Sequence, residues 1–297
     1  MDTPFSPAEE KSRAAVSSVI AALFLTGTKI FVGLMTGSLG ILSEAAHSTL
    51  DLVAALVTVF AVKTSAKPAD ADHPYGHGKV ENLSALFEAA LLLLTCAWII
   101  REAIERLFFR SVPVAASIWG FIVIGVSILV DISRSRALMK AAKKHQSQAL
   151  EADALHFSTD VWSSSVVLFG LGLVFLSKQL QMPWLVKADA IAALAVAGIV
   201  AWVSLQLGRK TIHELMDSVP EDLMQQARDR VKIIPGVQAV PRIRMRKTGG
   251  EWFSDVIVLV DPAMTMEAAH AIADAVEHSL GELMPGGDVV VHTEPMK

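Results

Sequence analysis

The sequence contains, at residues 43–51, the stretch SEAAHSTLD inside an otherwise apolar run. Its histidine and its last residue, an aspartate, are four positions apart, so on an α-helix both side chains leave the same face, one turn apart. The stretch HFSTD at residues 156–160 repeats this spacing at the start of another apolar run. Two imidazoles and two carboxylates have the composition of a metal site. The candidate ligands are His47, Asp51, His156 and Asp160.

The composition is that of a membrane protein. Of 297 residues, 53% are hydrophobic and 19% are charged, and the mean hydropathy is +0.47. This is too apolar for a soluble globular protein of this length, so the lipid bilayer is an expected partner. The net charge of -4 is small and gives no sign of nucleic acid as a partner.

Six apolar runs are each long enough to cross the hydrocarbon core of a bilayer, about 30 Å, as a helix. They predict an α-helical membrane domain with six transmembrane helices over residues 1–212. The predicted spans are residues 14–35, 39–62, 82–104, 114–132, 150–176 and 184–207.

Basic residues are distributed unevenly between the connections of these spans. The connections between spans two and three and between spans four and five carry more Lys and Arg than those on the opposite side. Because Lys and Arg are enriched on the cytoplasmic side, we expect both termini in the cytoplasm and a multi-pass protein of the plasma membrane, the inner membrane of a bacterial cell. The residues counted are Lys63, Lys67, Lys79, Arg134, Arg136, Lys140, Lys143 and Lys144.

Residues 213–297 have the sequence pattern of a separate soluble domain. The pattern predicts a helix, two alternating strands joined by a turn at residues 248–250, a second helix with Thr265 as its N-cap, and a last strand. This order favours a small α+β fold with its helices on one face of the sheet. The predicted elements are residues 221–234, 240–246, 252–260, 265–283 and 288–292.

The depth of the four candidate ligands can be estimated from the topology. If span two starts near Leu39 on the outer side, its histidine lies about 12 Å below that surface and its aspartate about 18 Å. If span five starts near Gln148 on the inner side, its own pair lies at about the same distances from the other surface. Across a slab of about 30 Å, the histidine of each span then lies at the same depth as the aspartate of the other span. The predicted neighbours are His47 with Asp160, and Asp51 with His156.

A closed set of two neutral imidazoles and two carboxylates suits tetrahedral Zn²⁺ and accepts other divalent transition metals. The two carboxylates balance the charge of the ion. Without the ion they would stand in a medium of low dielectric constant, so protons should take its place. This predicts exchange of divalent metal ions against protons, with metal loaded from the cytoplasm and released outward. The structural alternative, packing or hydrogen bonding by a single histidine, does not account for two such pairs.

The sequence resembles the cation diffusion facilitator family over nearly its whole length. Six spans, a tail domain and paired ligands in spans two and five carry the resemblance, and the most specific motif is DADHPYGHGKVEN at residues 70–82. The resemblance implies a metal efflux transporter, not an enzyme, with the four candidate ligands as its transport site. Many bacterial relatives have Asp where His47 stands. The histidine form resembles a zinc-preferring animal and plant branch, so Zn²⁺ is the expected cargo, with Fe²⁺, Cd²⁺, Co²⁺ or Ni²⁺ as alternatives.

The resemblance also implies a second metal position in the loop between spans two and three, with Asp70, His73 and His77 as its ligands. The residues alone allow another interpretation, a solvated turn shaped by Pro and Gly. The resemblance further implies that Lys79 pairs with Asp217, just after span six. An ordinary charge at the membrane edge is the alternative.

For the tail domain, the resemblance implies a ferredoxin-like, metallochaperone-like fold that makes the protein a homodimer and binds metal at its interface. Pro241 and Ile257 stand where further histidines are expected, so a full binuclear site is not expected. His270 also fits the polar face of an amphipathic helix. The matching positions are His270, His292 and Glu294, with Asp255 as an alternative ligand.

Two other kinds of protein are alternatives. A membrane-embedded metallohydrolase needs an open coordination position and a general base, often in the string HExxH. The string that begins at His213 continues Glu-Leu-Met-Asp, without the second histidine. A metal-sensing scaffold that has lost transport has no reason to keep all four ligands.

Lys29 is an unusual residue within the first span. It lies near the estimated depth of Glu44, and we expect the two side chains to pair, which makes both tolerable in an apolar medium. Snorkelling of Lys29 towards the outer surface is the alternative.

Overall fold

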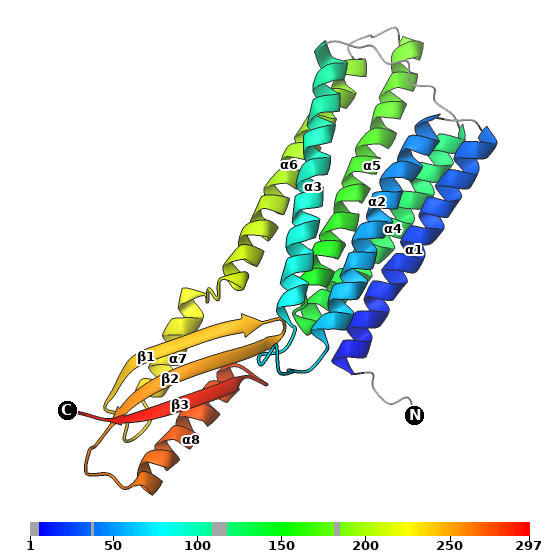
Figure 1. Ribbon diagram of the computed structural model, residues 1–297. Coiled ribbons are helices and arrows are strands. Elements are labelled where there is room, and N and C mark those ends of the chain that lie inside the picture. The colour runs from blue at the N-terminus through cyan, green and yellow to red at the C-terminus, as the bar shows by residue number, and fades with distance from the viewer. Residues whose placement is uncertain (1–5, 37–38, 109–117, 181–184) are drawn as a thin grey trace. The chain divides into compact units, whose positions relative to one another are not determined.

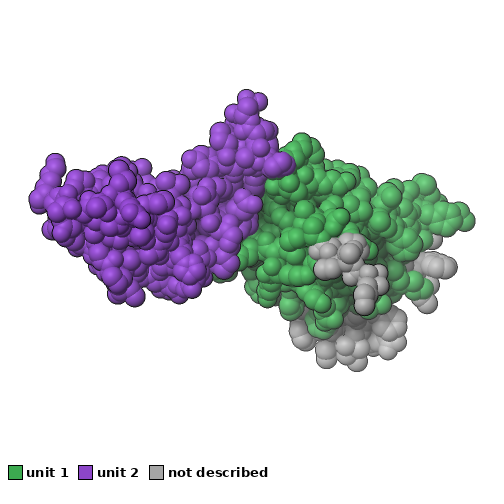
Figure 2. Space-filling model, turned by 90° about the horizontal axis from the view of Figure 1, so that it is seen from below, with its two compact units in different colours: residues 1–67, 80–211 green, residues 68–79, 212–297 purple. Residues whose placement is uncertain are grey.

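The structure is a computed structural model that describes residues 6–36, 39–108, 118–180 and 185–297. The chain divides into two compact units, which Figure 2 shows in different colours. The first unit consists of residues 1–67 and 80–211, and the second of residues 68–79 and 212–297. The loop before the third long helix is therefore grouped with the tail.

Six long helices follow one another along the chain and run side by side in the first unit (Figure 1). All six predicted spans are helical where the structure describes them, and the helices extend beyond the apolar runs at one or both ends. In the described residues, three segments are long and apolar enough to cross a membrane: Pro7–Met35, Ala45–Ser65 and Lys79–Glu105. The helices are α1 (Pro7–Thr36), α2 (Leu39–Ser65), α3 (Lys79–Phe108), α4 (Ile118–His145), α5 (Gln148–Leu180) and α6 (Leu185–Leu215).

The basic segment between spans four and five is mostly helical. Residues 133–145 continue α4 as a helix and include all five Lys and Arg side chains counted there. The segment contains no Gly or Pro and is rich in Ala, Lys and Arg, which are good helix formers. The helix ends where Gln146 takes a positive φ of 49°, and α5 begins at Gln148.

Small side chains allow the helices of the first unit to pack closely. The packed interior around α1, α2, α4 and α5 is rich in alanine, whereas large apolar side chains such as Phe24, Phe31 and Leu34 point outward. Close approach of backbones at small residues stabilises helix pairs in a membrane, where lipid already solvates the large side chains. The buried cluster contains Ala15, Ala61, Val62, Leu138, Ala142, Ala149, Leu150, Ala154 and Phe157.

One buried carboxylate joins four segments of the first unit. Glu81, at the start of α3, is 1% exposed. It accepts hydrogen bonds from Lys11 of α1 at 2.7 Å, from Ser65 of α2 at 2.7 Å, and from Ser147 between α4 and α5. Charge and hydrogen bonds together offset the cost of burying this group.

The second unit is a three-stranded sheet covered by two helices. The strand order is β1-β2-β3, with β1 and β2 antiparallel and β2 and β3 parallel. Both helices pack into one core with the same face of the sheet, and the Thr265 hydroxyl caps the second helix by accepting from the Ala268 N–H at 3.2 Å. The predicted order of elements is confirmed. The elements are α7 (Glu221–Lys232), β1 (Ala239–Thr248), β2 (Glu251–Val260), α8 (Met266–Leu283) and β3 (Asp288–Pro295).

The loop of residues 68–79 packs on the β1–β2 hairpin within the second unit. The guanidinium of Arg246 lies 3.6 Å from the ring centroid of Tyr75, and the Tyr75 ring meets Phe253 edge-on at 5.3 Å. A Cβ on Gly78 would stand 2.6 Å from the carbonyl oxygen of Thr248, so only glycine permits this approach. The loop therefore has a fixed support.

We expect Glu81→Ala to lower the stability of the purified protein by about 3 kcal/mol, because the substitution leaves the partly buried Lys11 and two serine hydroxyls without their carboxylate. Thermal unfolding in detergent measures the change. The matched control is Glu105→Ala, which breaks an ion pair with Arg101 whose side chains are 32% and 79% exposed. This pair should contribute less than about 1 kcal/mol. Equal midpoints for the two variants would contradict the role given to Glu81.

Candidate metal-binding sites

The four candidate ligands of the membrane domain lie together in a ring that alternates imidazole and carboxylate. Between helices, His47 Nε2 lies 3.9 Å from Asp160 Oδ1, and His156 Nε2 lies 3.2 Å from Asp51 Oδ1. Along the helices, His47 Nε2 lies 3.9 Å from Asp51 Oδ1, and His156 Nε2 lies 3.7 Å from the other oxygen of Asp160, Oδ2. The crosswise neighbours are those that the depth estimate predicts.

The positions of the two helices explain this meeting. α2 begins at Leu39 and α5 at Gln148, the two starting points that the depth estimate assumed. A spacing of four residues keeps each pair on one face of its helix. Because α2 and α5 pack against each other, the two faces meet within the bundle.

The distances between neighbouring side chains of the ring are close to those between ligand atoms around a small tetrahedral ion. Zinc bonds to nitrogen and oxygen are about 2.0–2.2 Å long, so neighbouring ligand atoms of a tetrahedron stand about 3.3–3.6 Å apart. The four distances of 3.2–3.9 Å in the ring bracket this value. The ligand atoms of His47, Asp51 and Asp160 all lie within 4.8 Å of one another, so one ion can reach all three.

The ring borders a small cavity, and its side chains differ in their exposure to solvent. The side chain of His156 is 6% exposed, whereas that of His47 is 25% exposed. The cavity has a volume of about 40 Å³, and a water molecule needs roughly 10–15 Å³. It is lined by Ala22, Leu25, Lys29, His47, Ser48, Asp51, Ile124, Asp131, Phe157, Asp160, Ser163 and Ser164.

Sequence reasoning missed one charged residue of this cavity. Asp131 of α4 is 5% exposed and lines the cavity beside the ring. A single acidic residue near the end of an apolar run was the available signal, because such residues in membrane spans face the interior of the bundle. Lys29 donates to the Ser48 hydroxyl at 2.7 Å, and the side chain of its predicted partner, Glu44, lies outside the described residues. The cavity wall therefore carries more charge than the ring alone.

A second buried carboxylate lies on α3. Glu88 is fully buried and accepts a hydrogen bond from Thr58 of α2. Its other carboxylate oxygen has no hydrogen-bond partner in the described part of the chain. Asp153 and His156, both on α5, are the charged groups that act on it. Glu88 falls within the third predicted span, residues 82–104.

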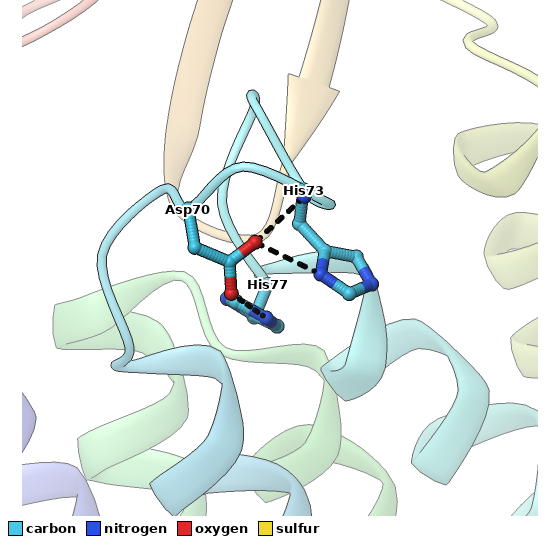
Figure 3. Close-up of side chains that lie close together, drawn as sticks. All are labelled: Asp70, His73 and His77. Carbon is cyan, nitrogen blue, oxygen red and sulfur yellow. Dashed lines mark hydrogen bonds and ion pairs between the residues drawn. The ribbon is translucent and has the colours of Figure 1, made fainter.

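The loop of residues 68–79 brings its three predicted ligands together (Figure 3). His73 Nδ1 lies 3.2 Å and His77 Nε2 3.4 Å from different oxygens of the Asp70 carboxylate. The three ligand atoms all lie within 4.8 Å of one another. The His73 backbone N–H donates to Asp70 at 2.7 Å and lowers the pKa of that carboxyl, so Asp70 stays ionised and able to bind a cation. Asp70 and His73 are exposed, so this site faces solvent.

The tail positions do not form such a cluster within one chain. His292 lies 3.5 Å from Glu294 on β3, and His270 lies 3.7 Å from Asp274 on α8. Among the described residues, only the ring and the loop bring three or more candidate ligands together. Ile257 is the register partner of His292, so an apolar side chain stands beside that histidine. Asp255 lies on β2 with Arg244 and Val290 as its register partners.

Comparisons with known proteins agree with this arrangement. The family described as the cation efflux transmembrane domain matches residues 15–216, and the cation efflux protein cytoplasmic domain matches residues 219–296. The cation-efflux pump FieF of Klebsiella pneumoniae and that of Escherichia coli K12 are each 30% identical over 285 residues, covering 96% of this chain and 92% of theirs.

Among solved structures, a variant of the MamM CTD is 27% identical and covers 26% of this chain and 95% of its own, with a TM-score of 0.25. The membrane part of the protein is a helical transmembrane domain, and the tail is the α+β domain that accompanies it in this family. The family models together span nearly the whole chain. The protein therefore belongs to the cation diffusion facilitator family, the cation efflux transporters of divalent metal ions.

Proposed function

We propose that this protein exports Zn²⁺ from the cytoplasm in exchange for protons, and that His47, Asp51, His156 and Asp160 hold the ion during transport. The observation that carries the proposal is the ring itself, in which nitrogen and oxygen atoms of four side chains on two antiparallel helices lie 3.2–3.9 Å from their neighbours. Two imidazoles and two carboxylates form a donor set common at tetrahedral Zn²⁺. Fe²⁺, Cd²⁺, Co²⁺ and Ni²⁺ are the alternative cargoes, because such a site also accepts them.

Charge balance supports the exchange with protons. Two ionised aspartates neutralise one divalent ion in a medium where uncompensated charge is costly. When the ion leaves, like charges on Asp51 and Asp160 face each other across a few ångströms, which favours the uptake of protons by the ring. Protons that enter from outside and leave towards the cytoplasm would then return the ring to its metal-binding form.

We assign the candidate ligands of the loop and of the tail to metal binding outside the transport site. Asp70, His73 and His77 form a solvent-facing metal position in the loop, where only three protein donors are available and water completes the coordination. In the tail, His270, His292, Glu294 and Asp255 are proposed to bind metal only weakly, across a homodimer interface. The match to a cytoplasmic domain of this family supports a tail that dimerises in the cytoplasm, with residues 1–212 in the plasma membrane and both termini cytoplasmic.

We expect Asp51→Ala to lower Zn²⁺ flux into proteoliposomes by about a hundredfold or more, because it removes one of four metal donors and half of the compensating charge. A fluorescent zinc indicator trapped in the lumen measures the flux. Asp229→Asn, which removes a carboxylate charge on the tail helix α7, is the matched control and should transport like the wild type. Wild-type protein that binds Zn²⁺ without moving it would favour the sensing scaffold instead.

Replacement of His47 by Asp should weaken the preference for Zn²⁺ over Cd²⁺ by about tenfold. A carboxylate adds a third negative charge, and its bidentate binding suits a larger ion with a higher coordination number. Competition between the two ions in the same flux assay measures the preference. An unchanged ratio, with transport retained, would show that another part of the protein selects the metal.

Proton exchange is tested with a pH-sensitive dye in the same vesicles. Zinc movement should produce a proton flux in the opposite direction that ends when zinc is removed, since ring protonation is coupled to release of the ion. Asp51→Ala vesicles should show neither flux. Zinc uptake without any pH change in well-sealed vesicles would refute the exchange while leaving zinc transport in place.

A further inference from the structure

Two charged side chains outside the four-membered ring share its cavity. Asp131 comes from α4 and Lys29 from α1, and they are 5% and 7% exposed. Both line the cavity together with ring members His47, Asp51 and Asp160. Helices α1 and α4 pack against each other, which brings these two residues to the same cavity wall. A membrane interior seldom contains charges without a function, so both residues require an explanation.

Four charged groups act on the buried carboxylate of Asp131. The charged groups that act on it are Asp160, Lys29, Asp51 and His156, and in the described residues it forms no hydrogen bond. A structural carboxylate in a bundle normally accepts hydrogen bonds that offset its burial, as Glu81 does from three donors. Asp131 therefore acts on its neighbours through its charge, and these neighbours belong to the ring or to the cavity wall.

The charges around the cavity sum to a simple value when all are ionised. Among the described residues that line it, Asp51, Asp131 and Asp160 contribute three negative charges and Lys29 one positive charge, which leaves a net charge of -2. A divalent ion in the ring brings the total to zero and itself favours the ionised form of Asp131. Without Asp131, Lys29 would cancel half of the negative charge that attracts the ion.

We propose that Asp131 is a charge-balancing residue of the cargo site, which compensates Lys29 and thereby sets the affinity of the ring for a divalent cation. The inference rests on the proposed function, since it assigns a further residue to the same site. Asp131 acts on the cargo through the electric field, whereas the four ring residues act as ligands. Lys29 contributes the opposing positive charge, and its ammonium donates to the Ser48 hydroxyl at 2.7 Å.

The test compares four proteins in zinc flux and equilibrium zinc binding: wild type, Asp131→Asn, Lys29→Met, and the double variant. Asparagine and methionine keep the approximate shape of each side chain and remove its charge. Asp131→Asn should raise both KM and Kd at least tenfold, because a unit charge acts strongly on a divalent ion in a medium of low dielectric constant. Because the ring ligands are untouched, kcat should change much less than KM.

The double variant separates charge balance from a packing role. Removing Lys29 together with Asp131 restores the net charge of -2, so its KM should return to within about threefold of the wild-type value. Lys29→Met alone makes the cavity more negative and should lower KM by about tenfold. A double variant as weak as Asp131→Asn, or a higher KM for Lys29→Met, would overturn the proposal.

The outcomes also distinguish this inference from the proposed function. A wild-type protein that neither binds nor transports zinc would refute the function itself. Normal wild-type transport together with an unchanged KM in Asp131→Asn would refute only the role of Asp131. Thermal unfolding of each variant checks its folding. If Asp131→Asn does not fold, Lys29→Met still tests the proposal, because a lower KM supports it and a higher KM overturns it.

Discussion

An ionised group inside a bilayer is stable only when opposite charge or hydrogen bonds stand beside it, and this constraint explains most of the polar architecture of the protein. Glu81 meets it with Lys11 and two serine hydroxyls, and Lys29 meets it in part with Ser48. The ring of His47, Asp51, His156 and Asp160 meets it only incompletely with protein groups. A carrier requires this shortage of compensating positive charge, because a bound cation can then supply it.

The helices satisfy the geometric side of the same constraint. Charges can compensate each other only at the same depth, and α2 and α5 run in opposite directions with their ligand pairs about the same distance from their starts. Alanine-rich contacts let the backbones approach closely enough for side chains as short as aspartate to meet. The close packing of small residues is therefore what allows the polar side chains to meet at one depth.

Much of this could be predicted from the sequence because the signals are local and periodic. The six apolar runs, the His-xxx-Asp spacing and the alternation in the tail strands each follow from helix or strand geometry, and the structure agrees with them. Asp131 and the partner of Glu88 could not be found this way, because each depends on which helix faces which. Helix α4 also continues beyond the fourth apolar run, since hydropathy falls at residues 133–145 while helix propensity does not.

The unequal exposure of the two histidines has a consequence for the path of an ion. His47 is the most exposed member of the ring and His156 the least, at 25% and 6% of their side chains. An ion held as proposed can exchange His47 for water while the other three donors still bind it. Dehydration can then proceed one ligand at a time, which keeps each activation barrier far below that for stripping a hydrated divalent ion in a single step.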